Sequence, residues 1–147
     1  MKIDDGRKTL ATGWQQRVDA LGRAHYRRYN ESTATRLAEA AEVVRDRWRG
    51  DLRRLAEESD HDAEAAAALL TEVPGIGPTG ADVVLREAQR VWPWLRPYLD
   101  ERVRQGAEQA GLPHSATALA KLFDGHDAAA LGAALVRVTV EGGPPRP

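Results

Sequence analysis

The sequence contains no cysteine, only three lysines, one methionine and one phenylalanine in 147 residues. Without cysteine, the chain can form no disulfide, zinc ribbon or iron–sulfur cluster, and it has no thiol nucleophile. No apolar run approaches the roughly 18 residues of a membrane span, and no basic-then-apolar leader opens the chain. We therefore expect a soluble, cytoplasmic protein.

The sequence also has no excess of positive charge. Its 21 Lys and Arg residues are balanced by 22 Asp and Glu residues, and the net charge is −1. This balance excludes histone-like binding through bulk charge, although it does not exclude a local basic patch. Hydrophobic residues make up 42% of the chain, which is enough for a core and excludes a disordered polyampholyte. The length suits one compact domain.

The hydrophobic spacing is helical along the chain, and alternation typical of strands is almost missing. The spacing predicts an all-α helical bundle with a flexible N-terminal segment at 1–13, a single helical domain at 14–140 and a disordered tail at 141–147. The predicted helices cover residues 14–28, 34–48, 51–57, 63–71, 81–88, 99–110 and 127–140. Residues 136–140 would also suit a strand.

Charge is distributed unevenly along this chain. Ten arginines and six acidic residues lie between positions 14 and 54, whereas residues 57–72 hold six acidic residues and no Lys or Arg. One interpretation is that these are solvated helix faces with ion pairs between neighbouring turns. The other is a surface that faces phosphate groups, with Arg27 and Arg28 as candidates.

The most informative segment joins the helices predicted at 63–71 and 81–88. Two glycines flank Ile76 there, which permits a tight turn and a close approach of the backbone to a partner. Successive backbone N–H groups beside a helix N-terminus suit an anion such as a DNA phosphate. The candidate DNA-binding residues are Pro74, Gly75, Ile76, Gly77, Thr79 and Gly80. The alternative is an ordinary connection between two helices.

This segment resembles the helix-hairpin-helix motif of the endonuclease III-type DNA glycosylases, whose form is roughly Leu-Pro-Gly-Val-Gly-Arg-Lys-Thr-Ala-x-x-Val-Leu. Residues 73–77, together with Ala81, Val84 and Leu85, fall on its landmarks. The likeness extends to Tyr29–Asn30 upstream and to the segment from Leu99 to Pro113. It implies a DNA-glycosylase-like fold, DNA repair by base excision, and a monovalent cation at the hairpin.

The resemblance also implies roles for two residues. The catalytic lysine of the family's bifunctional members aligns with Thr79, which cannot form an imine, so no lysine-type lyase is expected. Thr79 instead suits a helix N-cap, with Asp82 completing a capping box. Asp100 aligns with the family's catalytic aspartate, yet it also stands where an N-cap belongs. Replacing Asp100 by Asn is expected to leave stability nearly unchanged.

Two departures bear on activity and assembly. Family members have about two further helices before the matched stretch, and residues 1–13 are too few to supply them. The chain would then lack one wall of the pocket for a flipped base. Its apolar stripe over Trp14–His25 would be exposed, which favours a homodimer. The four histidines have no metal-ligand spacing, so no metal site is expected.

Three functions remain open at this point. The first is a helix-hairpin-helix protein that binds duplex DNA without sequence preference and is catalytically silent. The second is an active monofunctional DNA glycosylase that hydrolyses the base through Asp100. The third is a helical protein-interaction module without DNA binding, which is favoured if the arginines between positions 17 and 54 point away from the hairpin.

Overall fold

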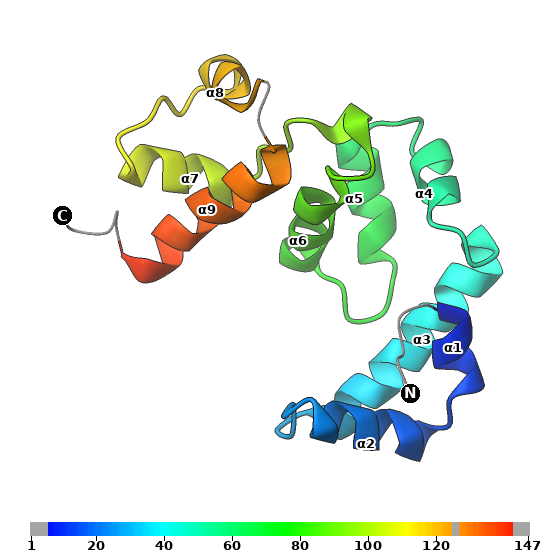
Figure 1. Cartoon of the computed structure of the whole chain (residues 1–147). Helices are drawn as coiled ribbons and strands as arrows, with labels where there is room; N and C mark the ends of the chain where they lie inside the picture. Colours follow the sequence, from blue (N-terminus) through cyan, green and yellow to red (C-terminus); the bar gives the residue numbers. More distant parts are fainter. Residues whose placement is uncertain (1–5, 125–126, 143–147) are drawn as a thin grey trace. The chain divides into compact units, whose positions relative to one another are not determined.

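The computed structural model describes residues 6–124 and 127–142. Within these residues there are nine α-helices, one short 3-10 helix and no strand (Figure 1), which confirms the all-α prediction. The chain divides into two compact units, Met1–Pro78 and Thr79–Pro147, and each is described by itself. The single helical domain over 14–140 stays a prediction.

The first unit is organised around one long helix. Its helices are α1 (Gly6–Ala11), α2 (Trp14–Arg23), α3 (Asn30–Trp48), α4 (Arg53–Glu58) and α5 (Ala63–Thr71). Helices α1 and α2 pack against α3, and α4 contacts both α3 and α5. The buried residues of α3 are Ala34, Ala41 and Trp48. Their spacing of seven residues places them on one stripe of the helix.

The N-terminal segment differs from the prediction of a flexible 1–13, because residues 6–11 form α1. The side chain of Arg17 is buried and binds backbone carbonyls on both sides of it. It donates from Nε to Ala34 (3.0 Å) and from one terminal nitrogen to Thr9 (3.1 Å) and Thr12. Helix α1 is short and has no apolar stripe, so these contacts with α2 and α3 order it, and the local sequence carries no signal for them.

Helix α3 ends where the sequence predicts. Arg49 and Gly50 adopt left-handed backbone conformations (φ 51° and 77°) and turn the chain towards α4. Across this turn, the indole Nε1 of Trp48 donates to Glu58 at 2.7 Å. The guanidinium of Arg47 binds both Glu58 and Glu72, so one arginine links the ends of α3, α4 and α5.

The second unit contains α6 (Pro78–Ala88), the 3-10 helix η1 (Pro93–Leu95), α7 (Glu101–Gln109), α8 (Ala116–Phe123) and α9 (Ala128–Glu141). Its apolar core draws on α7, α8 and α9 and consists of Val103, Ala107, Leu119, Phe123, Ala128 and Leu135. Helices α7 and α9 lie side by side (Figure 1). They approach so closely that a Cβ on Gly106 would overlap the backbone carbonyl of Leu135.

The second unit departs from the sequence prediction at α8 and at the end of α9. Helix α8 was not predicted, although Ser115 caps it by accepting from the amide of Ala118 at 3.3 Å. The helix predicted over 127–140 is confirmed as α9, and residues 136–140, which also suited a strand, are helical within it. That helix continues to Glu141 within the predicted tail, and residues 143–147 of the tail lie outside the described residues.

Candidate nucleic-acid interface

The turn after α5 is the centre of the candidate interface. The amide of Ile76 donates to the carbonyl of Val73 at 3.0 Å, and Gly75 has a φ of 86°. Proline at the second position and a glycine with positive φ at the third are typical of a type II turn. Val73 is buried and Ile76 half-buried, while Pro74, Gly75 and Gly77 are exposed. The turn is therefore anchored by two aliphatic side chains and presents its glycines to solvent.

One arginine lies directly against this turn. A Cβ added to Gly75 would come within 3.2 Å of Cδ of Arg36, so the aliphatic part of that side chain passes beside the glycine backbone. Arg36 is exposed and lies on α3. The tertiary structure thus places a positive charge at the glycine turn. Nothing in the sequence pattern singled out Arg36 from the other arginines.

Acidic side chains lie beside the turn at Pro74. Pro74 lines a hollow of about 460 Å³ whose further lining residues all come from α3: Glu39, Glu42, Val43, Asp46 and Arg47. Asp46 is paired with Arg45, and Arg47 is paired with Glu58 and Glu72. The carboxylates of this hollow disfavour a phosphate there, so the favourable place for an anion at the turn is beside Gly75 and Arg36.

The start of α6 corrects one prediction. Helix α6 begins at Pro78, a favourable first helical residue, so Thr79 lies within the first turn and is not the N-cap. The carboxylate of Asp82 accepts a hydrogen bond from the hydroxyl of Tyr98 at 2.7 Å instead of completing a capping box. The sequence prediction placed the start of this helix after Thr79, because it assigned Pro78 to the preceding turn.

Asp100 is the N-cap of α7, as one of its two interpretations predicted. Its Oδ1 accepts from the amides of Arg102 (2.9 Å) and Val103 (3.1 Å). Its Oδ2 lies 2.7 Å from Nε of Arg86, and the Asp100 side chain is only 2% exposed. The N–H direction of Arg86 does not align with this oxygen, so the contact is an ion pair without a hydrogen bond. Both oxygens of Asp100 are therefore occupied within the protein.

Further polar contacts hold the segment before α7. The buried side chain of Gln89 donates to the carbonyl of Arg86 at 2.9 Å and accepts from the amide of Tyr98 at 2.6 Å. Burial, followed by the hydrogen bond to the Asp82 carboxylate, raises the pKa of the Tyr98 hydroxyl. The sequence analysis missed Arg86 and Gln89. The signal for Gln89 was its spacing of four and eight residues from the apolar positions Leu85 and Ala81, whereas Arg86 directly follows Leu85 on α6.

The structure places Arg27 and Arg28 in the exposed loop between α2 and α3. The helix predicted over 14–28 ends at Arg23, and His25 adopts a left-handed backbone conformation (φ 64°). Of the ten arginines between 14 and 54, Arg17 is buried, and Arg45, Arg47 and Arg53 form ion pairs with acidic side chains. The basic surface predicted for this region is thus smaller than the sequence suggests.

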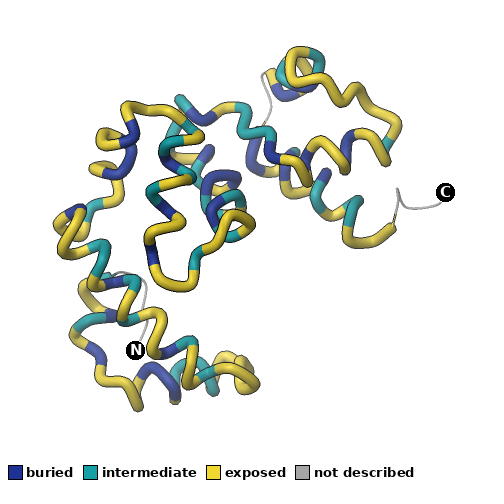
Figure 2. The backbone as a smooth tube through the Cα atoms, turned by 180° about the vertical axis from the view of Figure 1, so that it is seen from behind, coloured by how far each residue is buried: buried dark blue, intermediate teal, exposed yellow. Residues whose placement is uncertain are grey.

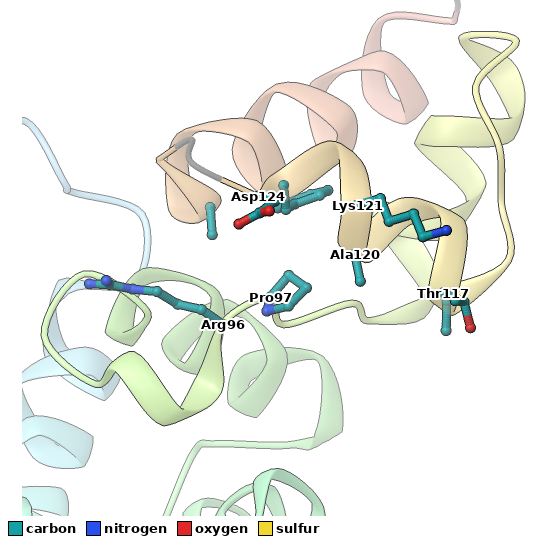
Figure 3. A pocket seen from close by; sticks show the side chains of 9 residues that line it. Arg96, Pro97, Thr117, Ala120, Lys121 and Asp124 are labelled. Atoms are coloured by element: carbon teal, nitrogen blue, oxygen red, sulfur yellow. The ribbon is translucent and has the colours of Figure 1, made fainter.

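A larger hollow of about 820 Å³ lies in the second unit between Pro97 and α8 (Figure 3). Arg96 lines it but donates to the backbone carbonyls of Gln89 and Arg90. In the same view, the ammonium group of Lys121 points away from Pro97 (Figure 3). Of the two cationic side chains that line this hollow, Arg96 is thus engaged with backbone carbonyls and Lys121 is directed away from Pro97.

In the part of the chain that the structure describes, no three His, Asp or Glu residues are grouped so that they could hold a metal ion. Over the same residues, no helix is long and apolar enough to cross a membrane. Comparison with protein-family models, with curated proteins and with solved structures finds no match to this chain.

Proposed function

We propose that this chain binds duplex DNA through the phosphate backbone, without reading the bases, and that it acts in connection with base-excision repair. The observation that carries the proposal is the exposed glycine turn at 74–77 with Arg36 against it. The resemblance of the turn sequence to the helix-hairpin-helix motif supports the same function.

Two kinds of group in the first unit would hold a phosphate at this place. The exposed residues Gly75 and Gly77 offer backbone N–H groups, which suit an anion where successive amides line a turn. Arg36 adds a formal charge beside Gly75. These contacts position the protein on DNA and carry no sequence information.

The resemblance implies a monovalent cation at the same turn. Carbonyl oxygens are the ligands that such a cation needs, and the exposed residues Pro74, Gly75 and Gly77 each carry one. When bound, the cation would neutralise part of the phosphate charge. The amides and Arg36 would keep the roles described above.

We further infer that the chain is catalytically silent at Asp100. A glycosylase aspartate must reach a water molecule or the sugar of a flipped nucleotide. Asp100 is only 2% exposed and is committed to two amides and to Arg86. Its position supports a structural role over the hydrolysis of a base.

A second function, a protein-interaction module without DNA binding, is favoured by one observation. The hollow beside Pro74 is lined by three carboxylates and a single arginine that is already paired. Such a surface suits a basic protein segment better than it suits DNA. This function predicts no measurable affinity for DNA at low salt.

The test is the binding of a fluorescent 20-base-pair duplex over a salt series, with and without an abasic-site analogue. Gly77→Leu is the informative variant, because a side chain at Gly77 meets nothing within 4 Å and its φ is ordinary. The variant should fold normally, as judged by circular dichroism, and should lose about tenfold in affinity, which corresponds to about 1.4 kcal/mol.

Ala133→Leu, at an exposed position of α9, serves as the matched control and should bind as the unmodified chain does. Equal affinities of Gly77→Leu and the control would remove the turn from the interface. No binding of the unmodified chain at 50 mM salt would leave the interaction module as the better proposal.

A further inference from the structure

The loop between α2 and α3 combines exposed aromatic rings with unpaired positive charge. We call residues 23–29, which are the last residue of α2 and the connection that follows it, the RY loop, after its arginines and tyrosines. Every residue of the loop is exposed (Figure 2). Tyr26 and Tyr29 are 47% and 52% exposed, so both aromatic residues are accessible from solvent.

The arginines of the RY loop are available for a ligand. Arg23, Arg27 and Arg28 form no ion pair in the described part of the chain, in contrast to Arg45, Arg47 and Arg53. The guanidinium of Arg28 lies over the ring of Tyr29, 5.1 Å from its centre. This cation–π contact uses one face of the ring, and Tyr29 as a whole remains 52% exposed to a further partner.

The backbone of the RY loop is ordered by hydrogen bonds. The amides of His25 and Tyr26 donate to the carbonyls of Gly22 (3.1 Å) and Leu21 (2.9 Å). The carbonyl of Tyr29 accepts from the amide of Thr33 at 2.9 Å and from the hydroxyl of Ser32 at 3.1 Å. Both tyrosines are therefore held at their backbones, which lowers the entropy cost of binding a ligand.

A hollow of about 510 Å³ lies beside the RY loop. Its lining residues are Val18, Asp19, Gly22, Arg23, Arg27 and Asn30. Asp19 is its one carboxylate and accepts a hydrogen bond from Gln15 at 2.9 Å. Two arginines at the rim and an amide side chain provide donors for phosphate and for polar edges of bases.

We propose that the RY loop binds single-stranded nucleic acid. Tyr26 and Tyr29 stack on unpaired bases, while Arg23, Arg27 and Arg28 contact the phosphates. Basic grooves with interspersed aromatic rings bind single strands in this way, because every base offers a π-face to stack on. A paired duplex hides these faces. The loop therefore adds a preference for unpaired strands that the glycine turn does not provide.

The experiment measures the binding of the full chain to labelled dT15 and to a 15-mer of abasic sugar-phosphate. The abasic strand has the same phosphates but no bases. We expect dT15 to bind at least about tenfold more tightly. Tyr26→Leu/Tyr29→Leu should lower dT15 affinity by about tenfold for each ring and leave abasic binding unchanged. Equal affinity for the two strands, or no effect of the double variant, overturns the proposal.

The charge contribution is tested with Arg23→Gln/Arg27→Gln/Arg28→Gln. Loss of three phosphate contacts to a single strand should flatten the slope of log affinity against log salt by about 2. Arg49→Gln/Arg54→Gln, at two exposed arginines, is the control and should change the slope little. Binding to vesicles containing phosphatidylserine with no binding to dT15 would show a lipid ligand and would overturn the proposal.

This proposal can fail separately from the proposed function. Gly77→Leu should weaken duplex binding without changing the affinity for dT15, and the tyrosine double variant should do the reverse. If Gly77→Leu also abolished dT15 binding, single strands would be held by the glycine turn, and the RY loop would not be a separate site.

Discussion

Nε of Arg86 lies 2.7 Å from Oδ2 of Asp100, and the two side chains are only 10% and 2% exposed. The pair joins α6 to the N-terminus of α7, where Asp100 also caps two amides. One carboxylate thus satisfies both a helix end and a buried cation. Removing its charge would leave the guanidinium of Arg86 without a counter-ion in a site that water does not reach.

The first prediction follows from this pair and corrects the expectation that Asp100→Asn is neutral. Asparagine caps a helix about as well as aspartate, but it leaves the charge of Arg86 uncompensated. Breaking a buried pair in this way costs about 3 kcal/mol. Urea unfolding should show this loss. Arg86→Leu/Asp100→Asn should recover part of it, and additive effects in the double variant would contradict a direct coupling.

The second prediction concerns the crossing of α7 and α9. Gly106→Ala should destabilise the second unit by about 3 kcal/mol, because the added Cβ overlaps the carbonyl of Leu135 and the backbone must move. Gly132→Ala on α9 is the matched control. Its Cβ would make an ordinary contact at 3.8 Å with Val103. This control should gain up to about 1 kcal/mol from helix propensity, as thermal unfolding can show.

The third prediction concerns pH. Hydrogen bonds from Arg47 and then from Trp48 hold the pKa of Glu58 below its usual value. A lowered pKa in the folded state means that Glu58 stabilises the fold above its unfolded pKa of about 4.3. This contribution is lost as the pH falls through the folded pKa.

Denaturant midpoints followed by tryptophan fluorescence should therefore fall more steeply below about pH 4.5 in the unmodified chain than in Glu58→Gln. Glu87→Gln removes an exposed carboxylate from α6 and should keep the steep fall. Parallel curves for the unmodified chain and Glu58→Gln would show that these hydrogen bonds do not persist in solution.

The fourth prediction tests the positive charge of Arg36 beside the glycine turn. Arg36→Gln should weaken duplex binding and flatten the salt dependence by about 0.9, the value for one phosphate contact on duplex DNA. Arg49→Gln removes the same charge elsewhere in the first unit and should leave the slope unchanged. Equal slopes for Arg36→Gln and the unmodified chain would place the phosphate away from Gly75.

The fifth prediction concerns chemistry. Thr79 stands where a lyase would carry its nucleophilic lysine, and the chain's lysines are Lys2, Lys8 and Lys121. Borohydride should therefore trap no covalent adduct with an abasic duplex, and no strand should be nicked. With Asp100 buried, no base release is expected over a panel of damaged bases. Base release that Asp100→Asn abolishes would favour the monofunctional glycosylase.

The sequence predicted the helices whose ends are marked by a capping residue, a glycine or a proline. Helix α5 has Asp62 as its N-cap and the Pro74–Gly75 turn after it, and its predicted bounds agree with the structure. Helix α3 was recognised by its apolar spacing and by Gly50. Helix α8 was missed because its eight residues follow a loop that carries little periodicity, although Ser115 offered a cap.

The same distinction holds for the candidate site. The turn glycines and the N-cap position of Asp100 could be predicted, because both depend on neighbouring residues. The contact of Arg36 with Gly75 and the pair between Arg86 and Asp100 join positions 39 and 14 residues apart. The sequence around Arg36 and Arg86 does not distinguish them from the other arginines of the chain. Only the tertiary structure shows that these two make the contacts.

The buried guanidinium of Arg17 has a practical consequence for anyone who shortens this protein. Two of its three carbonyl acceptors belong to Thr9 and Thr12, in a stretch that the sequence predicts to be flexible. A chain that starts at Gly13 would keep only Ala34 as an acceptor and would open a charged cavity against α3. Trimming twelve residues to aid crystallisation should therefore lower the yield of folded protein, and adding Arg17→Leu to the trimmed chain should restore part of it.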